Sequence, residues 1–355
     1  MAPALRRTYG LTLGETGVLI SATLVGSVAS LIPWGLATDR VGERIVLVSG
    51  LAGCGVFLLA AARAHGFWQL ALLLAAAGAL GASVQSASGR AVMHWFAPSE
   101  RGVALGIRQT AIPISGVLAA IALPPIVRAG GVSWGFAALG IACLAGGAVG
   151  GIVLREAEPA ESGAPVAASG PLRDRRIWTL SVGSALILAP QLCVAGFAVL
   201  FLHEARGVPA SAAAAALAVM QLLAIGGRIG AGRWSDLRRS RIGPLRTIAL
   251  AAAVLVGLVG VLVAAPLAVL VPVLVAAGAV SMSWNSLSFA AAVELAGYGR
   301  SGSAIGLQQT VLNVPGAAYP GLFGAFVAAT TWRAGFVVVA FFPLAGWRVL
   351  RALTR

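Results

Sequence analysis

The sequence predicts an all-helical membrane protein built from two related bundles of helices. The mean hydropathy is +0.93, 59% of the residues are hydrophobic and only 10% are charged. Apolar runs of about 20 residues recur along the whole chain, and each can cross a hydrocarbon core of roughly 30 Å as a helix. The alternating short strands that a membrane barrel needs are absent from the sequence.

The apolar runs divide the chain into two halves. Five predicted spans in the first half cover residues 15–34, 45–62, 68–95, 103–127 and 134–154. Six in the second half cover residues 177–202, 210–231, 245–264, 267–295, 303–328 and 334–350. The polar segment between them cannot bury a core and is typical of a flexible linker. We therefore expect a bundle over 1–154, a linker over 155–176 and a bundle over 177–355, with about 11 spans.

The basic residues predict the orientation of these spans. All 25 are arginine, and most lie in loops on the side of residues 35–44. This is the positive-inside pattern of a multi-pass protein of the cytoplasmic membrane, with the linker and the C-terminus cytoplasmic and the N-terminus outside. No soluble basic patch suggests nucleic acid. The three cysteines lie within apolar runs, so no disulfide, metal or redox role is expected.

Two sequence echoes relate the halves. Gly35 and Asp39 recur as Gly232 and Asp236, 197 residues later. The segment Gly106-Ile-Arg-Gln-Thr110 recurs as Gly306-Leu-Gln-Gln-Thr310, 200 residues later, and at the same offset Gln85 matches Asn285. Parallel repeats of this kind build many secondary transporters.

The pattern Gly35-x-x-x-Asp39-Arg40-x-Gly42-x-Arg44 resembles the signature loop between the second and third helices of the major facilitator superfamily. Glu43 stands where the family has the first of two paired basic residues. The resemblance implies two six-helix bundles, a small-molecule substrate with a possible coupling ion, and alternating access. One span precedes Gly35 where the family has two. We therefore expect the family's first helix to be missing, through a misplaced start or a truncation.

The resemblance also implies a gate at the signature loop and its echo. Its residues would pair across the cytoplasmic face and separate when the transporter opens inward; they are Gly35, Asp39, Arg40, Gly42, Arg44, Gly232 and Asp236. The alternative is a solvated charged turn that contributes less than about 1 kcal/mol.

Three arginines fall within or at the edge of predicted spans, where charges are costly and usually functional. They are Arg90, Arg108 and Arg228. The resemblance is to family members that carry small anions, such as monocarboxylate and cyanate porters, and a buried guanidinium can hold a carboxylate through two hydrogen bonds. The alternative is an arginine at a helix end that reaches the membrane interface.

Neutral amides complete the candidate cavity, because lipid cannot satisfy them. We single out Gln109, Gln309, Gln85, Asn285 and Asn313. Hydrogen bonding between helices is the alternative role.

We thus expect a secondary transporter of a small, anionic organic solute that works as a monomer in the bilayer, without cofactor or metal. Efflux of drugs or neutral metabolites is a second possibility. The sequence speaks against drug–proton exchange, because no acidic residue lies mid-span and Pro113-Ile-Ser-Gly116 only partly matches the antiporter signature. A non-transporting sensor or an inactive fragment is a third. An enzyme is not expected, since no nucleophile–base pair occurs.

Overall fold

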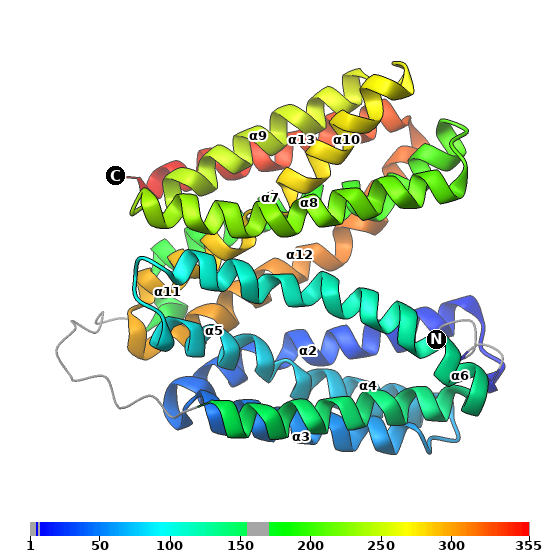
Figure 1. Cartoon of the computed structure of the whole chain (residues 1–355), viewed down its shortest axis with the longest axis vertical. Coiled ribbons are helices and arrows are strands. Elements are labelled where there is room, and N and C mark those ends of the chain that lie inside the picture. The colour runs from blue at the N-terminus through cyan, green and yellow to red at the C-terminus, as the bar shows by residue number, and fades with distance from the viewer. Residues whose placement is uncertain (1–4, 6–7, 155–169, 355) are drawn as a thin grey trace. The chain divides into compact units, whose positions relative to one another are not determined.

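The computed structural model describes residues 5, 8–154 and 170–354, and its regular elements are helices (Figure 1). The first half contains α2 (Leu13–Val41), α3 (Glu43–Ala61), α4 (Phe67–Gly81), α5 (Ser83–Trp95) and α6 (Arg101–Val153). The second half contains α7 (Arg175–Leu200), α8 (Ala210–Leu237), α9 (Ile242–Val261), α10 (Leu267–Ser281), α11 (Asn285–Ala296), α12 (Ser301–Ala329) and α13 (Trp332–Val349). Short helical turns are η1 (Pro171–Arg173), η2 (Phe201–Ala205), η3 (Tyr298–Arg300) and η4 (Leu350–Leu353).

Ten helical stretches of the described residues are long and apolar enough to cross a membrane. One of them, α6, has 53 residues, or about 80 Å at 1.5 Å per residue, more than twice the hydrocarbon thickness. Its helical geometry is interrupted at Gly130 and Gly131, where Gly131 has φ +71°. Counting α6 as two spans gives eleven spans in the described residues. The regular elements there are helices, which confirms the all-helical prediction.

The signature segment is helical for most of its length, so its assignment to a loop was wrong. Helix α2 begins with a capping box between Thr12 and Glu15 and continues through Asp39 to Val41. Gly42 alone separates α2 from α3, with φ +87°. One residue suffices for the turn because glycine tolerates this left-handed backbone region.

Two predicted spans are broken at related positions. The span over residues 68–95 is divided into α4 and α5 at Ala82, and the span over 267–295 into α10 and α11 at residues 282–284. At the second break, the Ser283 hydroxyl donates to the Ala279 carbonyl at 2.7 Å, and such side-chain bonds compete with helical hydrogen bonds. Such breaks expose backbone groups within the membrane depth, where transporters commonly bind their solutes.

Packing divides the chain into two units that do not coincide with its halves. Unit 1 comprises Met1–Trp95, Ile112–Leu172 and Ala296–Thr310, and unit 2 comprises Phe96–Ala111, Arg173–Leu295 and Val311–Arg355. Helices α6 and α12 therefore each begin in one unit and continue in the other. The predicted domain boundaries remain predictions, and linker residues 155–169 lie outside the described part.

Each unit has its own apolar core. In unit 1, α4 packs against α2 and α3, and Leu19, Leu70 and Phe136 belong to a buried cluster. In unit 2, α13 packs against α7 and α9 (Figure 1). Phe201 and Phe336 form an edge-on pair at 5.1 Å there, which strengthens the core beyond the area that they bury.

Candidate functional site

In unit 1, the end of α2 lies directly against the start of α12. A Cβ built on Gly35 would lie 2.5 Å from the carbonyl oxygen of Gly302, and one on Gly302 would lie 2.6 Å from that of Gly35. One turn further, a Cβ on Gly306 would lie 2.5 Å from the carbonyl oxygen of Leu31. The signature glycine is therefore required by backbone contact between two helices.

This contact brings Asp39 to the N-terminus of α12. Its carboxylate accepts hydrogen bonds of 2.8 Å from the backbone N–H groups of Gly302 and Ser303. These N–H groups have no partner within their own helix, and the helix dipole favours a negative charge at this end. Asp39 therefore binds a helix that starts more than 260 residues later in the sequence.

A charged cluster in unit 1 supports Asp39. Arg90 donates to the Thr38 carbonyl at 2.7 Å and to Asp39 at 3.3 Å, and it pairs with Glu43 at 3.2 Å. His94 Nδ1 lies 3.4 Å from Glu43 Oε1. Arg90 is thus a partner of the signature carboxylates in the described structure.

Unit 2 repeats this arrangement between α8 and α6. A Cβ on Gly102 would lie 2.5 Å from the carbonyl oxygen of Gly232. Asp236 accepts hydrogen bonds of 3.0 Å from the backbone N–H groups of Gly102 and Val103. The 197-residue echo therefore corresponds to a repeated contact in which a carboxylate caps another helix.

Arg241 is the buried cation beside Asp236. It contacts the Asp236 carboxylate, donates to Glu294 at 2.8 Å and donates to the Pro98 carbonyl at 2.9 Å. Burial disfavours its charged form, but the hydrogen bonds to Asp236 and Glu294 outweigh this and raise the pKa of Arg241. Arg241 therefore stays charged and tied to α8 and α11.

Two basic signature residues lie apart from these contacts. Arg40 is exposed, and Arg44 Nε donates to the Gly151 carbonyl at the end of α6, at 2.8 Å. Sequence reasoning missed Glu43, His94, Arg241 and Glu294 as members of the clusters. One signal was available, because His94 and Glu294 are 200 residues apart, which is the offset of the second echo.

Arg228, on α8, is a buried cation whose hydrogen-bond acceptors are neutral. Only 4% of it is exposed. Its Nε donates to the Met282 carbonyl at 3.0 Å and its Nη1 to the Gln109 carbonyl at 2.8 Å. Both acceptors lack regular helical partners: Pro113 cannot donate to Gln109, and Met282 lies in the break between α10 and α11. Among the described residues, no carboxylate pairs with Arg228.

The repeat shows that the fold does not need a cation at this position. A Cβ on Gly106 would lie 2.8 Å from the Arg228 carbonyl, just as one on Gly306 would approach the Leu31 carbonyl. Arg228 and Leu31 are 197 residues apart, so they occupy equivalent positions. Near the break between α4 and α5, the donors to the backbone carbonyl are neutral, because Ser30 and Trp34 both donate to the Ala79 carbonyl at 2.7 Å.

The remaining candidates divide between the units. In unit 2, Arg108 donates to the Gln109 side chain at 3.1 Å, and Asn285, 9% exposed, begins α11. Arg228, Arg108 and Gln109 are thus brought together. The half-buried amides are Asn313 of unit 2 and Gln85 and Gln309 of unit 1.

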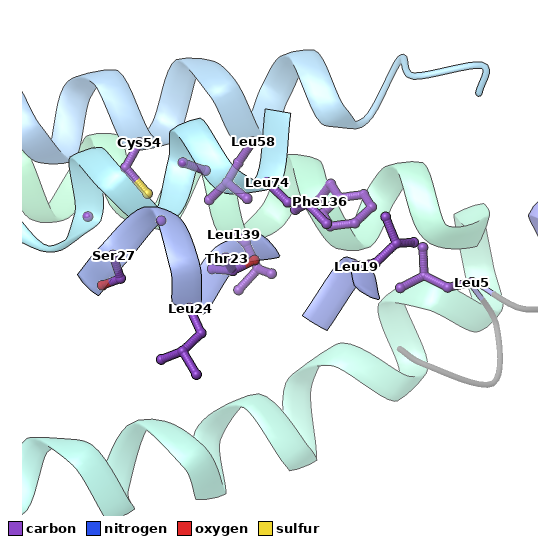
Figure 2. A pocket seen from close by; sticks show the side chains of 13 residues that line it. Leu5, Leu19, Thr23, Leu24, Ser27, Cys54, Leu58, Leu74, Phe136 and Leu139 are labelled. Atoms are coloured by element: carbon purple, nitrogen blue, oxygen red, sulfur yellow. The ribbon is translucent and has the colours of Figure 1, made fainter. Parts of the chain in front are cut away.

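Unit 1 also contains an apolar cavity of about 640 Å³ (Figure 2). Leucines and Phe136 form most of its wall, and Thr23, Ser27 and Cys54 supply its polar atoms. None of the predicted site residues lines it. With no charged side chain in its wall, this cavity does not suit an anion.

The sequence and the fold can be compared with known proteins. The family model described as Major Facilitator Superfamily matches residues 1–320. The chain belongs to the major facilitator superfamily. Two uncharacterised MFS-type transporters of Mycobacterium tuberculosis, from strains CDC 1551 / Oshkosh and ATCC 25618 / H37Rv, are each 32% identical to it over 97% of this chain and 78% of their own length.

Solved structures of superfamily members share the fold. A bacterial homologue of the iron transporter ferroportin, in an outward-facing state, has a TM-score of 0.77 at 15% identity, over 99% of this chain and 93% of its own. A proton:xylose symporter has a TM-score of 0.76 at 13% identity, over 100% and 90%. As a superfamily member the chain is a membrane transporter and not an enzyme. Its substrate, coupling ion and oligomeric state remain predictions.

Proposed function

We propose that this superfamily member carries a small organic carboxylate across the cytoplasmic membrane by alternating access. Arg228 is the observation that carries the proposal. A buried guanidinium is costly unless an anion or a full set of acceptors compensates it. Arg241 has two carboxylates, whereas Arg228 has two neutral carbonyls and stands where the repeat has leucine. A substrate carboxylate would supply the missing charge.

Some relatives that match part of this chain have names that favour an anionic solute. A Bacillus subtilis protein named hexuronate transporter is 24% identical over 33% of this chain and 28% of its own length. A Pseudomonas aeruginosa protein named 4-hydroxybenzoate transporter is 35% identical over 25% of this chain and 20% of its own. Both names denote carboxylates, the class that Arg228 would bind.

The gate of this proposal consists of the two capping contacts. Asp39, near the end of α2, caps α12, and Asp236, near the end of α8, caps α6. In each case the capped helix lies far away in the sequence. The arginine distribution favours the cytoplasmic side for both contacts. Breaking both contacts would release four backbone N–H groups to water. The net change in free energy is small, because water replaces the lost acceptors, and this suits a reversible step.

Replacement of Arg228 by its repeat counterpart tests the proposal. Purified wild-type protein and the Arg228→Leu variant are heated with propionate, lactate, benzoate or succinate, and with propionamide as the uncharged control. We expect at least one carboxylate to raise the wild-type melting temperature and to have no effect on Arg228→Leu. Arg228→Lys keeps the charge but loses the two-pronged geometry and should respond weakly.

Two results would contradict the proposal: a carboxylate that stabilises Arg228→Leu as much as wild type, or a panel in which no carboxylate stabilises wild type. The uncharged cavity of unit 1 favours a second candidate function, transport of an apolar neutral solute. Stabilisation by propionamide or another uncharged compound would support that alternative.

A further inference from the structure

The break between α10 and α11 contains polar atoms that the protein leaves unsatisfied. The Oδ1 atom of Asn285 is buried and accepts no hydrogen bond, and the same is true of the Ser281 hydroxyl, one helical turn earlier. A buried polar atom without a hydrogen-bond partner destabilises the folded protein. Native proteins keep few of them, and a ligand that supplies the missing partner is one reason to do so.

These atoms lie beside the cation of the candidate site. Arg228 binds the carbonyl of Met282, which immediately follows Ser281, and the Ser286 hydroxyl lies 3.5 Å from the Arg228 carbonyl. Met282 therefore contacts the side chain of Arg228, and Ser286 contacts its backbone. Asn285 lies between these two residues in the sequence, at the first position of α11. The break thus brings a buried guanidinium and an unpartnered amide to the same part of unit 2.

The two groups demand different features of one ligand. The guanidinium selects an anion, and the amide oxygen selects a hydrogen-bond donor. An ammonium donor would carry a positive charge toward Arg228, which repels it, whereas a hydroxyl donates without charge. We propose that the transported carboxylate is a hydroxy acid whose hydroxyl group donates to Asn285 while its carboxylate binds Arg228. This inference rests on the proposed function and narrows its substrate class.

Matched pairs of acids that differ by one hydroxyl test this assignment. The probes are lactate with propionate, malate with succinate and mandelate with phenylacetate, and binding is measured by calorimetry on the purified full chain. In at least one pair, wild type should bind the hydroxy acid about tenfold more tightly, since a hydrogen bond to an otherwise unsatisfied group contributes on the order of 1.4 kcal/mol.

The Asn285→Leu variant should lose this preference and bind both acids of the pair with the affinity that wild type has for the unhydroxylated one. Gln221→Leu, which removes a half-buried amide elsewhere on α8, should keep the preference. Trp284 precedes Asn285 and donates to Gln191 at 3.1 Å. In a background where the other eight of the nine tryptophans are replaced, its unchanged fluorescence would show that the break is intact in each variant.

The outcomes separate this inference from the proposed function. Equal wild-type affinity for both members of every pair overturns the hydroxy-acid assignment but leaves the carboxylate proposal standing. An Asn285→Leu variant that weakens both members equally also overturns it, because the amide then has only a structural role. Absence of binding by all six acids contradicts the proposed function itself.

Discussion

Gly35 and Gly302 are in reciprocal backbone contact, so neither position can accept a side chain without moving α2 away from α12. The Asp39 hydrogen bonds to Gly302 and Ser303 depend on this proximity. Gly232 and Gly102 form the equivalent contact between α8 and α6. The signature glycines and aspartates therefore act together. In each contact, the glycine lets the two helices approach closely and the carboxylate caps the second helix.

Helix α8 offers a direct test of the glycine contact. Gly232→Ala should push Gly102 away, lower stability by about 1–3 kcal/mol and reduce uptake in proteoliposomes, because the Asp236 cap is lost with the contact. Gly230→Ala is the matched control, since a Cβ there meets nothing within 4 Å. It should be neutral or slightly stabilising, as alanine favours helices. Equal effects of the two substitutions would contradict the contact.

The Asp39 cap can be tested through the exposure of Ser303, which is 2% exposed. In a cysteine-free background, Ser303→Cys should react slowly with a membrane-impermeant thiol reagent. Adding Asp39→Asn should speed the reaction severalfold, because the amide offers one accepting oxygen where the carboxylate uses two, and the cap loses about 1–2 kcal/mol. Glu100→Gln, which changes an exposed carboxylate, should leave the rate unchanged. A rate unaffected by Asp39→Asn would argue against the cap.

Arg241 should be a major contributor to stability. Arg241→Met leaves the buried Asp236 carboxylate without its cation, a change that typically costs roughly 3–5 kcal/mol. The exposed Arg238 provides the control, and Arg238→Met should change stability by less than about 0.5 kcal/mol. Denaturant unfolding in detergent measures both. A small loss of stability for Arg241→Met would contradict this prediction, because it would mean that water compensates the Asp236 carboxylate.

Two cysteines report on the packing of α3 against α6. The sulfur atoms of Cys54 and Cys143 are 3.8 Å apart, and Gly55 and Gly140 allow close backbone approach beside them. Iodine should oxidise this pair to a disulfide and leave Cys193 as the one alkylatable thiol, counted by mass spectrometry after denaturation. Three alkylatable thiols after oxidation would contradict this packing. In Cys143→Ser, both remaining thiols should stay reactive.

The family, the fold and the repeat could be predicted from sequence because each depends on local pattern. Long apolar runs predict the spans, and the recurrence of Gly35 and Asp39 at Gly232 and Asp236 predicts the two related positions. The partners of these residues could not be predicted. Gly302 and Ser303 are ordinary small residues, and only packing reveals that their N–H groups meet a carboxylate.

The helix breaks and the surroundings of Arg228 were also beyond sequence reasoning. The apolar runs continue through both breaks, so composition gives no boundary at Ala82 or Met282. The position of Arg228 near a span end allowed both a functional and a structural role. Its neutral surroundings emerge only when Gln109 and Met282 are placed beside it. The roles of these residues in gating and binding remain predictions.

The prolines of α6 and α12 have a mechanical consequence. Each helix passes from one packing unit to the other, at Ala111–Ile112 and at Thr310–Val311. Pro113 and Pro315 follow these boundaries within a few residues, and each removes a hydrogen bond that would stiffen its helix. Each helix is therefore easier to bend at this proline than an unbroken helix would be.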